Sequence, residues 1–390
     1  MNYPLMYNNI TREDTNEIIK FLSQETIPQL TNGPKIREFE SKWSEWLGVK
    51  YSLMVNSGAS ANELTLLYLK HKYPEGGEII VPPLCWVSDI AAILQNGFTP
   101  VFCDINYNNL ALNIDEVKSK ITNKTKAVLL IHILGYNGIN DDLINLCKEK
   151  NVLLIEDTCE SHGVTYKGKK VGSLSDVSNF SFYYAHHMTC IEGGIISTDN
   201  EEMYQLLRTF RSHGMLREST NNDFKQKVLS ENPSLNKDFV FVEAAHNFRS
   251  TEINAVIALN QIKRLDENNK IRSKNLNVFL DNLNKDLYYT EFDREGNSNY
   301  AFTLLLRNKN FELRNKVEKH MVDNQIEFRR GMSGGGNQLR QPYLKKYFSE
   351  NECEKYPVTE HVHHFGWYIG NYPELSTDKI LELVFILNKC

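Results

Sequence analysis

The fold of this chain is decided by the stretch Val152-Leu153-Leu154-Ile155-Glu156-Asp157. Four apolar residues in a row predict a strand that is buried on both faces, as in a parallel sheet. A helical pattern, Asp141–Lys150, comes before this strand, and another strand-like run, Asn179–Tyr183, comes after it. Such alternation predicts an α/β sheet whose strands are joined by right-handed crossovers.

Similar runs occur throughout the first two-thirds of the chain, with helical patterns such as Ala61–Leu69 and Ser88–Gln95 between them. They predict a large α/β domain, residues 1–251, around a mostly parallel sheet of seven strands. The further strand-like runs are Tyr51–Asn56, Glu78–Val81, Pro100–Asp104, Ala127–Leu134 and Gly194–Ser197.

Residues 252–390 have a different pattern. Glu252–Asp286 carries apolar residues at helical intervals and predicts a long helix that links two domains. A small α+β domain is expected to follow, ending in a helix that is capped by Ser376 or Thr377 and runs to about Leu387. Its other predicted elements are the strands Tyr300–Leu306 and Glu327–Arg330, the helix Glu312–Asn324 and the glycine-rich loop Gly331–Gly336.

The composition favours a globular protein of the cytoplasm. Of 390 residues, 41% are hydrophobic and 24% charged, and the net charge of −5 argues against a nucleic-acid binder. No apolar run approaches the ~20 residues that a membrane-spanning helix needs. The seven cysteines are dispersed without a C-x-x-C pair, so neither a metal site nor an iron–sulfur cluster is expected.

Small and acidic residues follow two of the predicted strands, at the sheet edge where ligands bind in open α/β folds. Gly58 and Ala59 open a helix after the first strand, where backbone N–H groups can bind a phosphate. The alternative is a simple turn with Ser57 or Ser60 as helix cap. Asp157 suits the protonated nitrogen of a pyridine cofactor, or equally the cap of the next turn.

Four further positions allow both a functional and a structural interpretation. Ser181 ends a strand and precedes the pair His186-His187, in which either ring suits proton transfer or a structural role. Trp86 suits stacking on an aromatic cofactor, or a place in the core. The segment Asn247–Arg249 offers groups for a phosphate, or a cap for the long helix.

The order and spacing of these motifs resemble the sugar aminotransferases of the DegT/DnrJ/StrS family. The resemblance extends from about residue 25 to the end of the chain. It rests on Thr31-Asn32-Gly33-Pro34, Asn56-Ser57-Gly58, Glu156-Asp157, Ser181-Phe182, Glu192-Gly193-Gly194 and Asn247-Phe248-Arg249.

This resemblance implies the aspartate-aminotransferase fold (fold type I), pyridoxal 5′-phosphate and pyridoxamine 5′-phosphate as cofactors, and a homodimer with shared active sites. Gly58, Ala59 and Ser181 would bind the cofactor phosphate, together with Asn247 from the other subunit. The remaining cofactor contacts implied are Trp86 stacked on the ring, Asp157 paired with its nitrogen and Glu160 beside it.

One position departs from the family pattern. Most members have a lysine five residues after the serine, where this chain has His186, and no lysine occurs between Lys170 and Lys225. An imidazole forms no stable Schiff base but still moves protons. The run Tyr183–Met188 resembles the sugar 3-dehydratases of the family, and the segment Arg329–Gln338 resembles their GDP-sugar branch in colitose biosynthesis.

The resemblance therefore implies His186 as the catalytic base of a lyase that removes the C3 hydroxyl of a GDP-4-keto-6-deoxy sugar, with L-glutamate as amino donor. The residues expected to contact the two substrates are His213, Arg217, Arg249, Arg329 and Arg330. Two alternatives are open. One is a 4-aminotransferase that uses Lys167, Lys169 or Lys170, and the other is a catalytically silent nucleotide-sugar binder.

Overall fold

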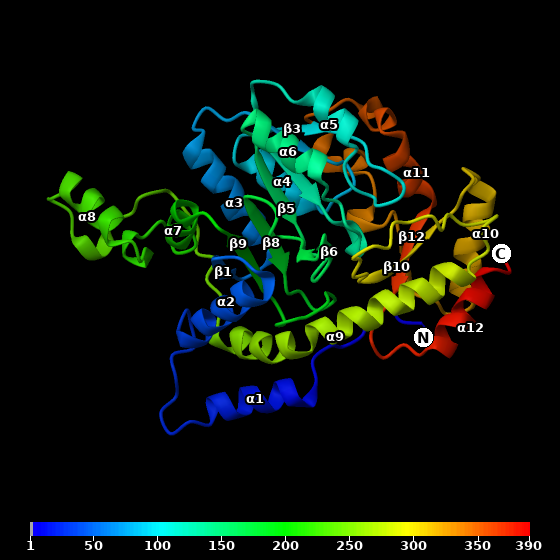
Figure 1. Ribbon diagram of the computed structural model, residues 1–390, viewed down its shortest axis with the longest axis horizontal. Coiled ribbons are helices and arrows are strands. Elements are labelled where there is room, and N and C mark those ends of the chain that lie inside the picture. The colour runs from blue at the N-terminus through cyan, green and yellow to red at the C-terminus, as the bar shows by residue number, and fades with distance from the viewer. Residues whose placement is uncertain (1–2) are drawn as a thin grey trace.

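The computed structural model describes residues 3–390, in which β5 (Leu153–Asp157) lies near the middle of a seven-stranded sheet (Figure 1). The strand order is β1-β9-β8-β5-β4-β2-β3. Only β9 runs antiparallel to its neighbours, so the expected mostly parallel sheet is confirmed. The other strands are β1 (Tyr51–Val55), β2 (Glu78–Val81), β3 (Thr99–Phe102), β4 (Thr125–Ile131), β8 (Val177–Ser181) and β9 (Gly194–Thr198).

Alternate residues of the strands pack into cores on opposite faces of this sheet. In β4, Leu129 and Ile131 belong to one core, whereas Val128 and Leu130 belong to another. Burial on both faces explains why most strand residues are apolar, although β8 also buries the polar Ser178 and Asn179. The helices of this part are α3 (Gly58–Lys72), α4 (Val87–Gln95), α5 (Ile114–Lys120), α6 (Asp141–Lys150), α7 (Glu201–Phe210) and α8 (Asn222–Glu231), and β6 (Thr165–Tyr166) with β7 (Lys169–Lys170) forms a small hairpin.

Some predicted bounds were wrong for local reasons. The strand expected over Ala127–Leu134 ends at Ile131, because Ile133–Gly135 forms a turn with Leu134 at φ 51°. Two helices near the N-terminus were not predicted, α1 (Arg12–Leu22) and α2 (Pro34–Leu47). Both bury one side on the long helix that follows residue 251.

The chain after residue 251 supplies that helix, α9 (Glu252–Asn282), and a three-stranded antiparallel sheet of order β10-β12-β11. Its central strand, β12, and the helix before it were not predicted. The division into domains 1–251 and 252–390 stays a prediction. The elements are β10 (Ala301–Leu305), α10 (Phe311–Asp323), β11 (Phe328–Arg330), α11 (Pro357–Phe365), β12 (Gly366–Gly370) and α12 (Thr377–Leu387), the last capped by Ser376 as expected.

The helix α9 runs alongside both sheets, and polar contacts fix its N-terminal half (Figure 1). At its first residue, the buried Glu252 carboxylate accepts hydrogen bonds from the N–H groups of Gly33, Lys35 and Ile36, at 2.8, 2.8 and 3.1 Å. These donors lie at the start of α2, where a negative charge also compensates the helix dipole.

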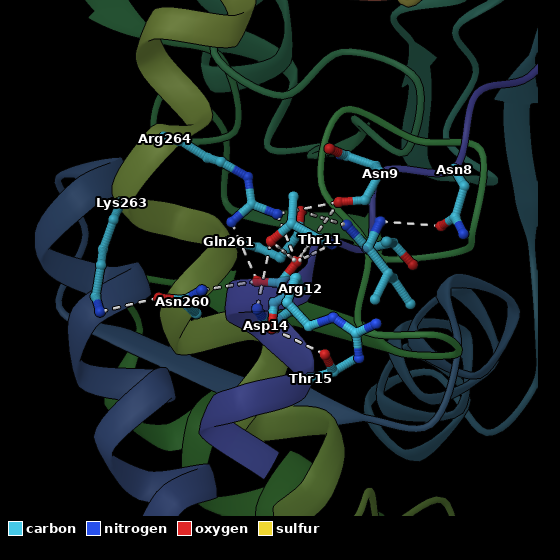
Figure 2. A network of polar contacts seen from close by, with 12 residues as sticks. Asn8, Asn9, Thr11, Arg12, Asp14, Thr15, Asn260, Gln261, Lys263 and Arg264 are labelled. Atoms are coloured by element: carbon cyan, nitrogen blue, oxygen red, sulfur yellow. Dashed lines mark hydrogen bonds and ion pairs between the residues drawn. The ribbon is translucent and has the colours of Figure 1, made fainter. Parts of the chain in front are cut away.

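A second polar cluster holds α1 against α9 (Figure 2). The buried Asp14 carboxylate accepts hydrogen bonds from Asn260 and Gln261 at 2.8 and 2.9 Å, and pairs with Arg264 at 2.6 Å. The Asp14 carboxylate also accepts the backbone N–H of Thr11, the residue that caps the N-terminus of α1. Burial raises the pKa of Asp14, but the hydrogen bonds from Arg264, Thr11 and Asn260 outweigh burial, and the net pKa lies below its ordinary value.

We predict that Asp14→Asn lowers the free energy of unfolding by about 2–3 kcal/mol, because a buried group loses its charge-assisted hydrogen bonds. A carboxyl whose pKa is lowered by folding stabilises the protein above its unfolded pKa of ~4 and loses this effect as the pH falls through the folded pKa. The difference from wild type, measured by urea unfolding, should therefore shrink below about pH 4. Glu13→Gln, at an exposed position of the same helix, is the control, and an equal loss in both variants contradicts the assignment.

Candidate active site

A cavity of about 440 Å³ opens at the carboxyl edge of the large sheet, next to the ends of β1, β4, β5 and β8. Parallel strands end at the same edge, so groups far apart in the sequence meet there. The N-terminal segment and the small sheet complete its wall. The lining residues are Leu5, Met6, Ser57, Gly58, Ala59, Trp86, Ser88, Asp89, Ile131, His132, Asp157, Cys159, Glu160, Ser181, Tyr183, Ala185, His186, Tyr300, Arg329, Ser333 and Tyr368.

One end of the cavity is suited to an anion. The Ser57 side chain caps α3 by accepting the Ser60 N–H at 3.0 Å, and the N–H groups of Gly58 and Ala59 belong to a first turn that has no intrahelical acceptor. The Ser181 hydroxyl lies beside them. A Cβ atom on Gly58 would come within 2.6 Å of the Ser181 Cβ, so this close approach requires glycine. Capping and anion binding are therefore compatible here.

Two carboxyl groups and a tryptophan line the adjoining part. Asp157 accepts hydrogen bonds from the Cys159 N–H at 2.9 Å and from Asn62 Nδ2 at 3.0 Å. Burial raises the pKa of Glu160 to about 7, although hydrogen bonds from Leu134 and Ser333 favour its anion. Trp86 is 56% exposed, so it lies at the cavity wall and not in the core. A flat aromatic group with a basic nitrogen and a phosphate fits these residues.

His186 presents one ring nitrogen as a proton acceptor. Its Nδ1 lies 3.1 Å from the Ser181 carbonyl oxygen, which only accepts hydrogen bonds, so Nδ1 carries the proton and Nε2 the lone pair. Burial lowers the pKa of His186 to about 4, while the Ser181 hydrogen bond and the charge of Asp157 oppose this shift in part. The imidazole is therefore neutral at pH 7. His187 is buried outside the cavity, with Nε2 bonded to the Ser298 carbonyl at 2.7 Å.

Within residues 3–390, no lysine lines this cavity. Lys167 pairs with Asp141, Lys169 is exposed, and Lys170 lies over the Trp46 ring, 4.8 Å from its centroid. The alternative that one of these lysines replaces the missing amine has no support in their positions.

Five of the residues singled out from the sequence do not line the cavity of their own chain. His213 and Asn247 are exposed on neighbouring segments, which the His213 N–H joins to the His246 carbonyl at 2.7 Å. Arg217 lies near the Phe239 ring, and Arg249 is half-buried close to Asn247 in sequence. Arg330 contacts Glu318 at 3.4 Å, because successive residues of a strand face opposite sides and Arg329 faces the cavity. Their roles stay predictions.

The DegT/DnrJ/EryC1/StrS aminotransferase family matches residues 8–388, which is nearly the whole chain. The chain belongs to this family. It is 29% identical to a GDP-4-keto-6-deoxy-D-mannose 3-dehydratase of Yersinia pseudotuberculosis, over 100% of this chain and 99% of the relative. It is also 26% identical to a GDP-perosamine synthase of Escherichia coli O157:H7, over 92% of this chain and 91% of that protein.

Structural comparison confirms the expected fold. A solved GDP-4-keto-6-deoxymannose-3-dehydratase with a trapped PLP-glutamate geminal diamine superposes with a TM-score of 0.86 at 28% identity, over 99% of this chain and 100% of the other. As a member of the family, the chain has the aminotransferase fold that the sequence motifs predicted.

Sequence analysis missed several residues that line this site, among them Asp89, Tyr300 and Tyr368. Asp89 resembles an ordinary first-turn residue of a helix. Tyr368 lies in the small sheet and Tyr300 directly precedes it, and the position of this sheet at the cavity is a tertiary feature. No group of His, Cys, Asp or Glu in residues 3–390 is arranged to hold a metal ion. None of the described helices has the length and apolarity to cross a membrane.

The orientation of His186 leads to a prediction for the cofactor-free protein. We expect its imidazole to stay neutral down to about pH 4, with the proton on Nδ1, because burial disfavours the cation and Ser181 fixes the tautomer. Multiple-bond ¹⁵N–¹H NMR measures both properties, and the His186→Asn variant assigns the signal. Titration near the ordinary ~6.5, or a proton on Nε2, contradicts this orientation.

Proposed function

We propose that this chain is a pyridoxal-phosphate-dependent 3-dehydratase of a GDP-4-keto-6-deoxy sugar, with L-glutamate as amino donor. The observation that supports this most is a neutral His186 facing the cavity at the family's lysine position, with no lysine lining the cavity in residues 3–390. The products would be 2-oxoglutarate, ammonia and a GDP-4-keto-3,6-dideoxy sugar for surface polysaccharide.

The cavity residues have defined parts in this proposal. Gly58, Ala59 and Ser181 bind the cofactor phosphate, Asp157 pairs with the ring nitrogen, and Trp86 stacks on the ring. Bound pyridoxal phosphate supplies an electron-withdrawing ring and an amino group taken from glutamate, which together allow a hydroxyl next to a ketone to leave.

His186 serves both halves of the reaction by moving protons at Nε2. In the first half it would accept the Cα proton of glutamate and pass it to the cofactor. In the second half it would remove this proton from the cofactor, so that the C3 hydroxyl can depart. General-base catalysis of this kind contributes roughly 10²–10⁴-fold. Glu160, with a pKa of about 7, lines the same cavity, but its proposed role is to contact the cofactor and not to act as the base.

The substrate groups are assigned by position and charge. Arg329 faces the cavity and suits the diphosphate, because a guanidinium matches the geometry of phosphate oxygens. His213, Arg217, Arg249 and Arg330 do not line the cavity of their own chain, so we propose them for the glutamate carboxylate and the nucleotide from the family resemblance alone.

The perosamine synthase relative favours a second candidate, a 4-aminotransferase. An aminotransferase would return an amino sugar and release no ammonia, whereas a dehydratase releases one ammonia for each sugar. Mass spectrometry of the products from GDP-4-keto-6-deoxy sugars with glutamate, together with an ammonia assay, separates the two. Absence of both products would leave the silent nucleotide-sugar binder.

The assignment of His186 is tested by two substitutions. His186→Asn keeps the size and polarity of the side chain but removes the titratable nitrogen, and we expect dehydration to fall by at least ~10²-fold. His186→Lys should attach the cofactor covalently, seen as cofactor mass retained after borohydride reduction, while dehydration still falls sharply. A normal rate in His186→Asn contradicts the role of His186 as the base.

We further propose a homodimer in which each subunit completes the site of the other. Large apolar side chains are exposed around the cavity, including Trp86, Val87, Tyr183 and Ile191, and exposed apolar groups that cluster mark contact surfaces. Asn247 would reach the phosphate of the partner's cofactor, which explains why it lies away from the cavity of its own chain.

Mixed dimers test this shared site. Coexpressed His186→Asn and Asn247→Asp chains should regain about a quarter of wild-type activity, because half of the dimers are mixed and each of these has one intact site. Each variant expressed alone should be nearly inactive. If every site belongs to one chain, the mixture stays as inactive as its parts.

A further inference from the structure

Two carboxyl groups meet in the wall of the cavity. Asp89, on α4, and Asp157, at the end of β5, both accept hydrogen bonds from Asn62 Nδ2, at 2.8 and 3.0 Å. Asp89 is 0% exposed and Asp157 is 5% exposed. The function proposed above gives Asp89 no part, although it lies against the residue that would hold the cofactor nitrogen.

No lysine, arginine or histidine among residues 3–390 forms an ion pair with either carboxyl group. The charges that raise the pKa of Asp89 are those of Asp157 and Glu160, both acidic. Burial and the charge of Asp157 raise the pKa of Asp89 well above its ordinary value. Two ionised carboxylates cannot lie together in a site without water or a cation, so the pair holds one proton.

The hydrogen bonds around the pair fix the orientation of the Asn62 amide. Asn179 donates to Asn62 Oδ1 at 2.9 Å, and Thr65 donates to Asn179 Oδ1 at 3.0 Å, so Nδ2 of Asn62 is turned toward the carboxyl groups and directs one N–H to each. Each carboxyl also accepts one backbone N–H, so hydrogen bonds from the protein do not distinguish the two. Burial does, because Asp89 is completely buried, whereas Asp157 is slightly exposed to the cavity, where a cationic ligand group favours its anion.

We propose that Asp89 is a positioning residue, which as a buried carboxylic acid donates a hydrogen bond to the Asp157 carboxylate and fixes its orientation toward the cavity. This inference rests on the proposed cofactor site, because Asp157 is the residue that would hold the ring nitrogen. With Asn62, Asp89 occupies the acceptor positions of Asp157 that face the protein interior. The pair carries one negative charge, which matches one protonated ring nitrogen.

The acid form of Asp89 has a direct spectroscopic signature. Infrared spectra of the purified protein at pH 7, recorded without added cofactor, should contain the carbonyl stretch of a buried carboxylic acid. Glu160, with a pKa of about 7, contributes such a band itself at pH 7, so the test is made in the Glu160→Gln variant. The band should survive in Glu160→Gln and be absent from the double variant Glu160→Gln/Asp89→Asn. No such band in Glu160→Gln, or a band that persists in the double variant, overturns the proposal.

The positioning role is measured by binding of pyridoxal phosphate. Asp89→Ala removes the donor and should weaken binding by roughly 10–100-fold, the usual effect of losing a group that orients a ligand-binding residue. Asp89→Asn is neutral and keeps an N–H donor, so it should lose much less affinity than Asp89→Ala. Asn113→Ala controls for loss of a helix cap, because Asn113 caps α5 away from the cavity.

The outcomes distinguish this inference from the proposed function. If wild type itself does not bind pyridoxal phosphate, the proposed function fails, and the infrared band alone decides whether Asp89 is an acid. If wild type binds the cofactor and Asp89→Ala binds it equally well, the positioning role is wrong. If Asp89→Asn loses as much affinity as Asp89→Ala, an ionised Asp89 is required and the proposal is overturned. Should Asp89→Ala fail to fold, the Asp89→Asn affinity and the infrared spectra still decide.

Discussion

The structure depends on one constraint, the burial of a parallel sheet on both faces. Because most strand positions must be apolar on both sides, the polar groups that reach the cavity come mainly from the strand ends. The carboxyl ends of β1, β5 and β8 lie at the same edge, where Gly58, Asp157 and Ser181 meet. The helix that follows β1 adds its unpaired N–H groups to this edge, so the site for an anion follows directly from the topology.

Electrostatics inside the cavity are set by burial more than by ion pairs. The same desolvation keeps His186 neutral and raises the pKa values of Glu160 and Asp89. A neutral imidazole beside acidic groups is an environment for proton transfer. It differs from the lysine amine expected at this position in an aminotransferase. In the proposed function, a histidine at the family's lysine position replaces an amine by a proton acceptor, while the fold is retained.

The helix α9 holds this frame together from outside. Glu252 joins its first turn to the start of α2, and Asp14 joins its middle to α1. Both carboxylates are buried, and each is satisfied by several donors, which is the condition under which a buried charge is tolerated. The glycine-rich loop after β11 packs against the large domain next to Trp86. This close approach requires glycine, because a Cβ atom on Gly334 would come within 2.0 Å of the Cys85 carbonyl oxygen.

The sequence by itself determined the large sheet, the long helix and the residues that follow the strands, because apolar runs and helix caps are local signals. It also identified His186, since a motif with fixed spacing shows a replaced residue at once. Only the tertiary structure decided the rest. The central strand β12 is short and bounded by glycines, and its pairing with β10 and β11 comes from chain segments up to some seventy residues away. Asp89 lies in the first turn of α4, where acidic residues are common, so the sequence shows no sign of a second role. Its link to Asp157 through Asn62 appears only when α3 packs against α4, because the pKa of a buried carboxyl depends on neighbours that are distant in sequence.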